Sequence, residues 1–272
     1  MNEKRTIYRL CESALMLAFA AVLSVIKLID MPYGGSVTLF SMLPLIIIAY
    51  RYGTRWGLLT GFAYGLIQLL LGMDNLSYAT SFGAGVAIIL FDYGIAFTVL
   101  GLGGIFRKMV PSQGVALSLG AVLTGGLRYL CHVISGCTVW YGLSVPTGES
   151  LVYSFGYNIY MVPETLLLVI GAVYVSRLLN FNEFMITRAA PIRAALPIST
   201  VLTVIGTSGL LAAAIWDVVE IVPHLQSEEA AILLSGLAQA DWMTMGIVTG
   251  GAILLFVVTT WIARRLNQKG TS

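Results

Sequence analysis

The chain has 272 residues, of which 58% are hydrophobic and only 10% are charged, and its mean hydropathy is +0.88. About a quarter of the residues in an ordinary soluble domain are charged, so this composition excludes a soluble globular protein and predicts an integral membrane protein. The formal net charge of +2 gives no sign of a nucleic-acid partner, and none is expected.

The three cysteines, Cys11, Cys131 and Cys137, do not form a disulfide framework. Cys131 and Cys137 are six residues apart, which is not a neighbouring spacing on a helix. A metal site beside His132 would need further ligands, usually four in all, and His224 is far away in sequence. We therefore expect neither a metal nor a cofactor.

Apolar runs predict eight transmembrane helices in an all-α integral membrane protein. The run that follows Lys4, Arg5 and Arg9 is too long for a signal peptide and lacks a clean cleavage site, so we expect a retained first span. The second and third runs are short for a full span, which takes about 20 residues. The expected helices cover 8–29, 36–50, 57–73, 83–106, 113–137, 154–179, 195–216 and 243–264.

The distribution of basic residues orients this arrangement. With the N-terminus in the cytoplasm, 13 of the 15 lysines and arginines fall on the cytoplasmic side. Only Lys27 and Arg128 fall toward the outer half. By the positive-inside rule both termini are expected in the cytoplasm of a multi-pass plasma-membrane protein, surrounded by the lipid bilayer.

Small residues at intervals of four predict close helix contacts. Gly57, Gly61 and Gly65 form one such row, and Ala14 and Ala18 form another. Spacing alone favours packing within the protein for both rows, and docking onto a separate membrane subunit is the alternative.

Three ionisable residues lie inside predicted helices at a similar depth. At 1.5 Å per residue, Asp92, Arg128 and Glu164 are each roughly 14 Å below the outer rim. Unpaired charges at this depth are costly, so we expect Arg128 to pair with one or both carboxylates. An interhelical ion pair without a further role is one interpretation, and a functional site is the other.

Aromatic and polar residues surround these charges. A carboxylate among aromatic rings suits a flat, positively charged ligand, whereas each Trp or Tyr taken singly is typical of the interfacial belt. Tyr33, at the tip of the first outer loop, is either such a belt residue or part of a lid. The other candidates are Tyr93, His132, Trp140, Tyr153, Tyr157 and Asn158.

Motifs of catalysis are missing from the sequence. It contains no HExxH, nucleophile elbow, Walker A sequence or dinucleotide-binding glycine pattern, so we expect no enzyme and no ATP hydrolysis by this chain through a Walker A site. Active transport would therefore need a partner or an ion gradient.

Several ordered segments resemble a known family. The chain carries ESALMLAFAAVLSVIKL, PYGGSVTLFSMLPLIIIAYRYG, WGLLTGFAYGLIQLLLG, LFDYGIAF and then RYLCHVISG followed by W, YS and YN. Over residues 8–182 these resemble the ThiT family, the thiamine-specific substrate-binding (S) components of energy-coupling factor (ECF) transporters. The resemblance implies a six-helix bundle that holds thiamine near the outer face. It also implies docking onto a transmembrane coupling protein and two cytoplasmic ATPase subunits.

The resemblance also assigns roles to residues. Ala14 and Ala18 match the docking face, which reverses the preference from spacing alone. Asp92 and Tyr93 match the acidic residue and tyrosine at the thiamine rings, although the family more often has glutamate at the first position. The residues His132, Trp140, Tyr153 and Asn158 match the pocket, and Tyr33 lies in the lid loop.

The C-terminal part departs from the family, which usually ends after six helices. We expect an S-component core at 1–182, a cytoplasmic linker at 183–194, and an additional transmembrane hairpin with a basic tail at 195–272. The expected function is capture of extracellular thiamine for uptake by an ECF module. A self-sufficient proton-coupled transporter for thiamine or a related vitamin is the alternative, with Asp92, His132 and Glu164 as the proton relay.

Overall fold

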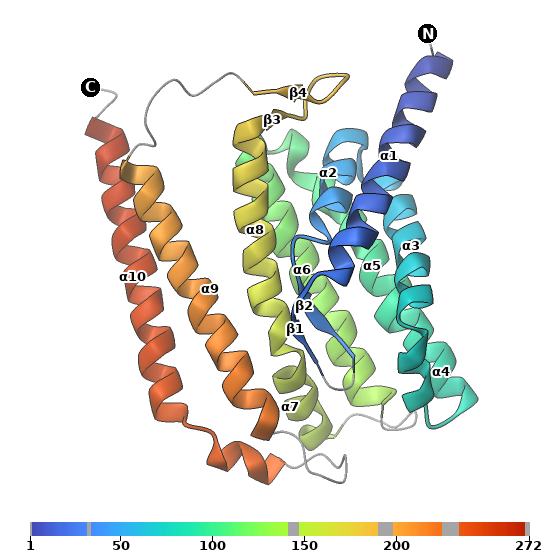
Figure 1. Ribbon diagram of the computed structural model, residues 1–272, viewed down its shortest axis with the longest axis vertical. Helices are drawn as coiled ribbons and strands as arrows, with labels where there is room; N and C mark the ends of the chain where they lie inside the picture. The colour runs from blue at the N-terminus through green and yellow to red at the C-terminus, as the bar shows by residue number, and fades with distance from the viewer. Residues whose placement is uncertain (1, 32–33, 141–146, 190–197, 225–233, 270–272) are drawn as a thin grey trace. The chain divides into compact units, whose positions relative to one another are not determined.

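The computed structural model describes residues 2–31, 34–140, 147–189, 198–224 and 234–269. These residues are almost entirely helical (Figure 1). They form two compact units, Met1–Ala189 and Ala190–Ser272.

The first unit contains the four strands and most of the helices found among the described residues. Two stretches change helix type without breaking: α4, η2, α5 and η3 run on from Phe82 to Lys108, and α7, η4 and α8 from Gly148 to Leu178. In chain order the elements are α1 (Asn2–Val25), β1 (Lys27–Asp30), β2 (Ser36–Thr38), α2 (Leu43–Tyr52), α3 (Thr54–Leu71), η1 (Met73–Tyr78), α4 (Phe82–Ile88), η2 (Ile89–Ile95), α5 (Ala96–Thr98), η3 (Val99–Lys108), α6 (Gln113–Thr138), α7 (Gly148–Tyr157), η4 (Asn158–Tyr160), α8 (Met161–Leu178), β3 (Leu179–Asn180) and β4 (Thr187–Arg188).

The helical membrane fold predicted from the apolar runs is confirmed. Counting each continuous stretch once, the described residues form eight helical segments of ten residues or more. Six of them are long and apolar enough to cross a membrane, while α2, with ten residues, is shorter, as expected.

The predicted end of the span 8–29 and the predicted start of the span 36–50 are wrong, because both fall in a β-hairpin. Helix α1 stops at Val25, and β1 and β2 pair antiparallel, with Lys27 opposite Thr38. Gly34 and Gly35 have φ of 95° and 89°, which favours glycine, and they carry the chain through the turn between the strands. The turn glycines therefore mark a hairpin where the apolar pattern alone suggested helix.

The glycine row on α3 packs inside the bundle, as the spacing predicted. A Cβ added at Gly61 would lie 2.6 Å from the carbonyl oxygen of Phe97, and one at Gly65 would lie 2.6 Å from that of Tyr93. From the other side, a Cβ at Gly101 would lie 2.1 Å from the amide nitrogen of Leu58. Only glycine lets α3 and the Phe82–Lys108 segment approach this closely.

A buried ion pair joins α6, α8 and the hairpin. Arg128 and Glu164 are 6% and 3% exposed, and Nη1 of the arginine lies 3.1 Å from Oε2 of the glutamate. The other carboxylate oxygen accepts hydrogen bonds from the hydroxyl of Thr38 at 2.8 Å and from its amide at 3.3 Å. The Arg128 guanidinium also lies 4.7 Å from the ring centroid of Phe97. Glu164 thus holds the end of β2 against the helices.

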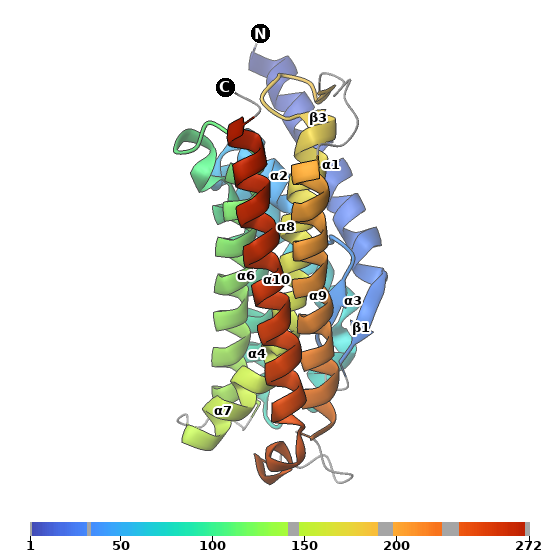
Figure 2. The same cartoon turned by 90° about the vertical axis from the view of Figure 1, so that its left-hand side faces the viewer.

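The second unit contains α9 (Ile198–His224), η5 (Leu234–Gln239) and α10 (Trp242–Lys269). The helices α9 and α10 lie side by side along their length (Figure 2). Gly206 permits this approach, because a Cβ there would lie 2.2 Å from the hydroxyl of Thr259. Asp241 caps α10 by accepting hydrogen bonds from the amide and hydroxyl of Thr244, which lower the pKa of its carboxyl.

The glycine contact predicts a difference between two Gly→Ala variants. We expect Gly61→Ala to lower the free energy of unfolding by about 1–3 kcal/mol, because its Cβ meets backbone. Gly126→Ala on α6 is the control, since no atom lies within 4 Å of its Cβ, and it should be neutral or stabilising by up to about 1 kcal/mol. Equal unfolding free energies for the two purified variants in detergent would contradict this packing.

The ion pair predicts a second ordering of variants. Glu164→Ala leaves the Arg128 guanidinium buried without its carboxylate and should lower the free energy of unfolding by about 3–5 kcal/mol. Thr38→Val removes only a hydroxyl from the same carboxylate and should cost about 1 kcal/mol. Denaturant unfolding checks both values. A Glu164→Ala cost no larger than that of Thr38→Val would show that the pair does not hold these elements together.

Candidate functional site

Asp92 is the centre of a cluster of hydrogen bonds. Its Oδ1 lies 2.8 Å from Nδ1 of His132. Its Oδ2 accepts from the hydroxyl of Ser135 at 2.7 Å and from the indole nitrogen of Trp140 at 3.3 Å. His132 and Ser135 lie on α6, and Trp140 follows soon after the end of that helix. The end of α6 therefore supplies three partners to one carboxylate on the neighbouring segment.

The backbone at Asp92 is unusual. Asp92 lies in η2, a π-helical segment of seven residues. Such segments close i→i+5 hydrogen bonds, are rare, and occur frequently at functional sites. The wider turn changes which face of the segment the following residues occupy. Asp92 is directed to α6, whereas its neighbour Tyr93 bonds to the η1 region instead.

One polar atom of the cluster is left without a partner. Nε2 of His132 is buried and has no hydrogen-bond partner in the part of the chain that the structure describes. Buried polar atoms without partners are costly and uncommon. Because Nδ1 is engaged by Asp92, a ligand with a polar group could bond to Nε2. In the described ranges, no group of three or more His, Cys, Asp and Glu residues could hold a metal ion.

An aromatic pair lies beside the carboxylate. The rings of Trp140 and Tyr78 have centroids 5.9 Å apart and planes inclined by 35°. Tyr78 ends η1, and the sequence reasoning did not single it out. Ser135 was also missed, although its position three residues after His132 places both on one side of α6.

The candidate residues Tyr157 and Tyr93 lie on either side of the β1–β2 turn. The hydroxyl of Tyr157 donates to the carbonyl oxygen of Gly34 at 3.0 Å, and the rings of Tyr153 and Tyr157 stack at 5.7 Å. The hydroxyl of Tyr93 donates to the carbonyl oxygen of Gly72 and accepts from Asn75 Nδ2, both at 3.0 Å. A Cβ at Gly34 would meet the Asn75 side chain at 3.0 Å, so the turn lies between these groups.

Asn158 bonds within its own helical segment. Its Nδ2 donates to the carbonyl oxygen of Ser154 at 2.9 Å, and the side chain is buried. It begins η4, the tight turn between α7 and α8. Pro163 lies just beyond and has no amide to bond the carbonyl of residue 159, which explains the irregular turn.

The Arg128–Glu164 ion pair is separate from the Asp92 cluster. Arg128 pairs with Glu164, and Asp92 is bonded to His132 instead. The sequence left open whether Arg128 pairs with one or with both carboxylates, and in the structure it pairs with Glu164 alone. On α1, Ala14 and Ala18 are exposed and make no internal packing row. Tyr33, the predicted lid residue, lies outside the described residues.

Comparisons with known proteins agree with one another. The sequence model of the family described as "Thiamine transporter protein (Thia_YuaJ)" matches residues 10–183. The chain is 37% identical over 177 residues to thiamine transporter ThiT of Bacillus subtilis, covering 60% of this chain and 88% of that protein. It is 27% identical over 175 residues to thiamine transporter ThiT of Lacticaseibacillus paracasei, covering 58% of this chain and 81% of that protein.

A solved structure of ThiT from Listeria monocytogenes aligns with a TM-score of 0.49 at 23% identity, covering 63% of this chain and 92% of that chain. The family model covers well over half of the chain, and its description names transporters rather than enzymes. The segments that carry this match are the six helical stretches that place the Asp92 cluster. This multi-pass membrane protein therefore belongs to the thiamine transporter family.

Proposed function

We propose that this chain is a substrate-binding S component that captures extracellular thiamine at the Asp92 cluster and delivers it for uptake with an ECF module. The observation that carries the proposal is the convergence of His132, Ser135 and Trp140 on the Asp92 carboxylate. The names of the relatives supply the substrate, since both are called thiamine transporters.

The chemistry of the cluster suits thiamine, a flat aromatic cation. A cation near an aromatic face is attracted by the negative potential of the ring, and a carboxylate completes the neutralisation. Trp140 and Tyr78 supply the rings, and Asp92 supplies the charge. An ionised carboxylate has about four acceptor positions, so Asp92 can accept from a ligand while keeping its protein partners. Nε2 of His132 gives a further polar contact.

The remaining candidate residues bond to the turn and the helix ends around the Asp92 cluster. Tyr157 bonds the β1–β2 turn, and Glu164 bonds Thr38 at the end of β2. We assign Tyr93, Tyr153, Tyr157, Arg128, Asn158 and Glu164 to positioning the turn and the helix ends around bound thiamine. Tyr33 lies in the sequence of this turn, and its assignment as part of a lid remains our proposal.

The basic residues support an outward-facing site. The N-terminal end of α1 and the β3–β4 hairpin lie at one end of the first unit, and α4 and α7 lie at the opposite end (Figure 1). Arg5, Arg9 and Arg188 belong to the first of these ends. The positive-inside rule assigns that end to the cytoplasm, together with both termini of the chain. The Asp92 cluster then lies toward the outer side of the plasma membrane.

Helix α1 supplies the proposed docking face. Ala14 and Ala18 are exposed one turn apart, beside the exposed side chains of Leu15 and Phe19. Small residues at this spacing let another helix approach closely. We propose that the transmembrane coupling protein binds here and connects the chain to two cytoplasmic ATPase subunits. We also propose 183–194 as the linker to the additional hairpin at 195–272; its first part, 183–189, packs in the first unit, and 190–194 lie outside the described residues.

Substitutions in the cluster test the thiamine site. We expect Asp92→Asn and Trp140→Ala each to weaken thiamine binding by at least about 1 kcal/mol, roughly fivefold in Kd, through loss of charge or of the ring face. Isothermal titration calorimetry on purified protein measures this. The matched controls are Asp74→Asn and Trp216→Ala, which alter exposed side chains that make none of the hydrogen bonds to Asp92. Wild-type affinity in both cluster variants would refute the assignment.

Substitutions on α1 test the docking face. Ala14→Arg and Ala18→Arg should leave thiamine affinity unchanged and abolish thiamine uptake, because the long charged side chain prevents the coupling protein from approaching. Val122→Arg, at an exposed position on α6, controls for a charge placed toward lipid. Radiolabelled uptake in cells that express the coupling subunits checks this, and normal uptake by both α1 variants would exclude docking at this face.

The contact between His132 and Asp92 favours one second candidate, a self-sufficient proton-coupled transporter. A histidine 2.8 Å from a carboxylate can pass a proton, and ionisable residues inside transmembrane segments often form such relays. Thiamine uptake in cells that lack the coupling subunits, abolished by an uncoupler, would establish this alternative. Uptake that requires the subunits and survives the uncoupler would exclude it.

A further inference from the structure

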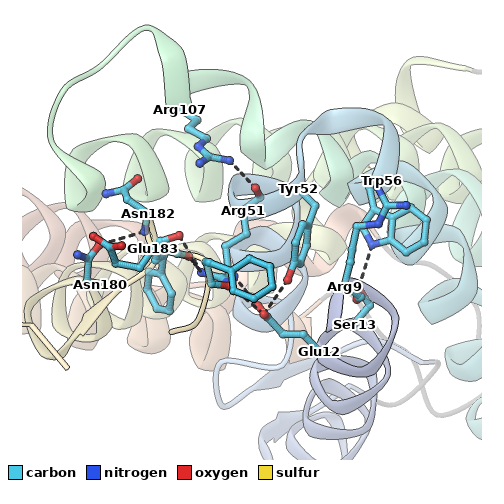
Figure 3. A network of polar contacts seen from close by, with 12 residues as sticks. Arg9, Glu12, Ser13, Arg51, Tyr52, Trp56, Arg107, Asn180, Asn182 and Glu183 are labelled. Atoms are coloured by element: carbon cyan, nitrogen blue, oxygen red, sulfur yellow. Dashed lines mark hydrogen bonds and ion pairs between the residues drawn. The ribbon is translucent and has the colours of Figure 1, made fainter. Parts of the chain in front are cut away.

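A basic cavity lies at the opposite end of the first unit from Asp92. Its volume is about 490 Å³, and its walls come from the start of α1, the ends of α2 and η3, and the segment between β3 and β4. Figure 3 shows the polar contacts in this region, among them those of Arg9, Arg51 and Arg107. The lining residues are Arg5, Thr6, Arg9, Arg51, Tyr52, Arg107, Phe181, Asn182, Glu183 and Phe184. Four arginines and one glutamate thus line this basic cavity.

Arg51 is the structural member of the group. It pairs with Glu12, its Nε lying 2.5 Å from the carboxylate, and donates to the carbonyl oxygens of Phe181 at 2.8 Å and Phe184 at 3.0 Å. Its side chain is buried. These bonds fix the β3–β4 segment to α1 and α2. Because the Arg51 guanidinium is already paired with Glu12 and bonded to two carbonyl groups, we do not assign it to ligand binding.

The other three arginines are placed without carboxylate partners. In the ranges that the structure describes, no acidic side chain lies within ion-pair distance of Arg5, Arg9 or Arg107. The Arg9 guanidinium lies 3.9 Å from the ring centroid of Trp56, and its Nε is buried without a hydrogen-bond partner. Arg107 donates to the carbonyl oxygen of Arg51. The cavity therefore combines excess positive charge with an unsatisfied buried donor.

We propose that this cavity binds the phosphate headgroup of an anionic phospholipid. Guanidinium groups bind phosphate oxygens through paired, charge-assisted hydrogen bonds, and stacking on an aromatic ring holds the guanidinium in place. Basic pockets at the cytoplasmic side of transmembrane helices are suited to acidic headgroups. The cavity would hold the phosphate against Arg5 and Arg9, with Arg107 as a third donor.

The surface beside the cavity selects a lipid over a soluble phosphate. Phe184, which lines the cavity, and its neighbour Met185 are 51% and 55% exposed, and the ring of Tyr8 on α1 packs against that of Phe184 with centroids 5.1 Å apart. A phosphate held at Arg9 thus lies beside exposed apolar side chains at the rim of the cavity, against which acyl chains can pack. A soluble phosphate would use the arginines and leave this surface unused.

Lipid titration followed by native mass spectrometry tests the proposal on the purified, delipidated full-length chain. Wild type should bind phosphatidylglycerol in preference to phosphatidylcholine. The double variant Arg5→Gln with Arg9→Gln should bind phosphatidylglycerol about tenfold more weakly and lose the preference. The control is Lys4→Gln with Lys108→Gln, which removes the same charge from exposed residues outside the cavity and should keep the preference. Size-exclusion chromatography and circular dichroism confirm that each variant is folded.

Each other outcome overturns the assignment to a lipid. Equal binding of the two lipids by wild type, or an equal loss in the control variant, would show that the cavity recognises no headgroup. Inorganic phosphate that binds wild type through Arg5 and Arg9, without a preference for phosphatidylglycerol, would assign the cavity to a soluble anion. Unchanged lipid binding with loss of copurification with the coupling subunits would assign it to an acidic segment of a protein partner.

Discussion

The need to neutralise a buried carboxylate organises the first unit. Glu164 is surrounded by helices and would be costly as an isolated charge. Arg128 compensates it from α6, and Thr38 donates two hydrogen bonds to it from β2. The same carboxylate therefore fixes a helix pair and the β1–β2 hairpin. Because Arg128 is engaged there, Asp92 is held by His132, Ser135 and Trp140, which keeps a second carboxylate near the helix ends.

Departures from regular helix produce the site. The π-helical turn presents Asp92, the turn at Asn158 precedes Pro163, and the hairpin replaces the end of one predicted span and the start of the next. In a membrane, irregular backbone is tolerated where protein buries it or where it lines a cavity. The close glycine contacts between α3 and the Phe82–Lys108 segment provide such cover. Tight packing of small residues and the irregular, polar region beside it are thus parts of one arrangement.

The two ends of the first unit differ in the charge they offer. At one end a carboxylate lies beside aromatic rings, which suits a cation, and at the other end arginines lie over aromatic rings around a cavity, which suits an anion. Arg5 and Arg9 of this cavity and the exposed residues Ala14 and Ala18 belong to the same helix, α1. A lipid headgroup in that cavity would lie close to the proposed docking face, so lipid composition and association with the coupling subunits would be physically connected.

The sequence by itself determined the membrane class, the helical segments, the internal glycine row and the family, because apolar run length, small-residue spacing and ordered motifs are local properties of the chain. It also identified Asp92, His132 and Trp140 as candidates. Only the tertiary structure decided which carboxylate Arg128 meets, that Lys27–Asp30 pairs with Ser36–Thr38, and that Ser135 and Tyr78 join the cluster. These outcomes depend on contacts between segments far apart in the chain and on a π-helical turn, and neither leaves a periodic signal in the sequence.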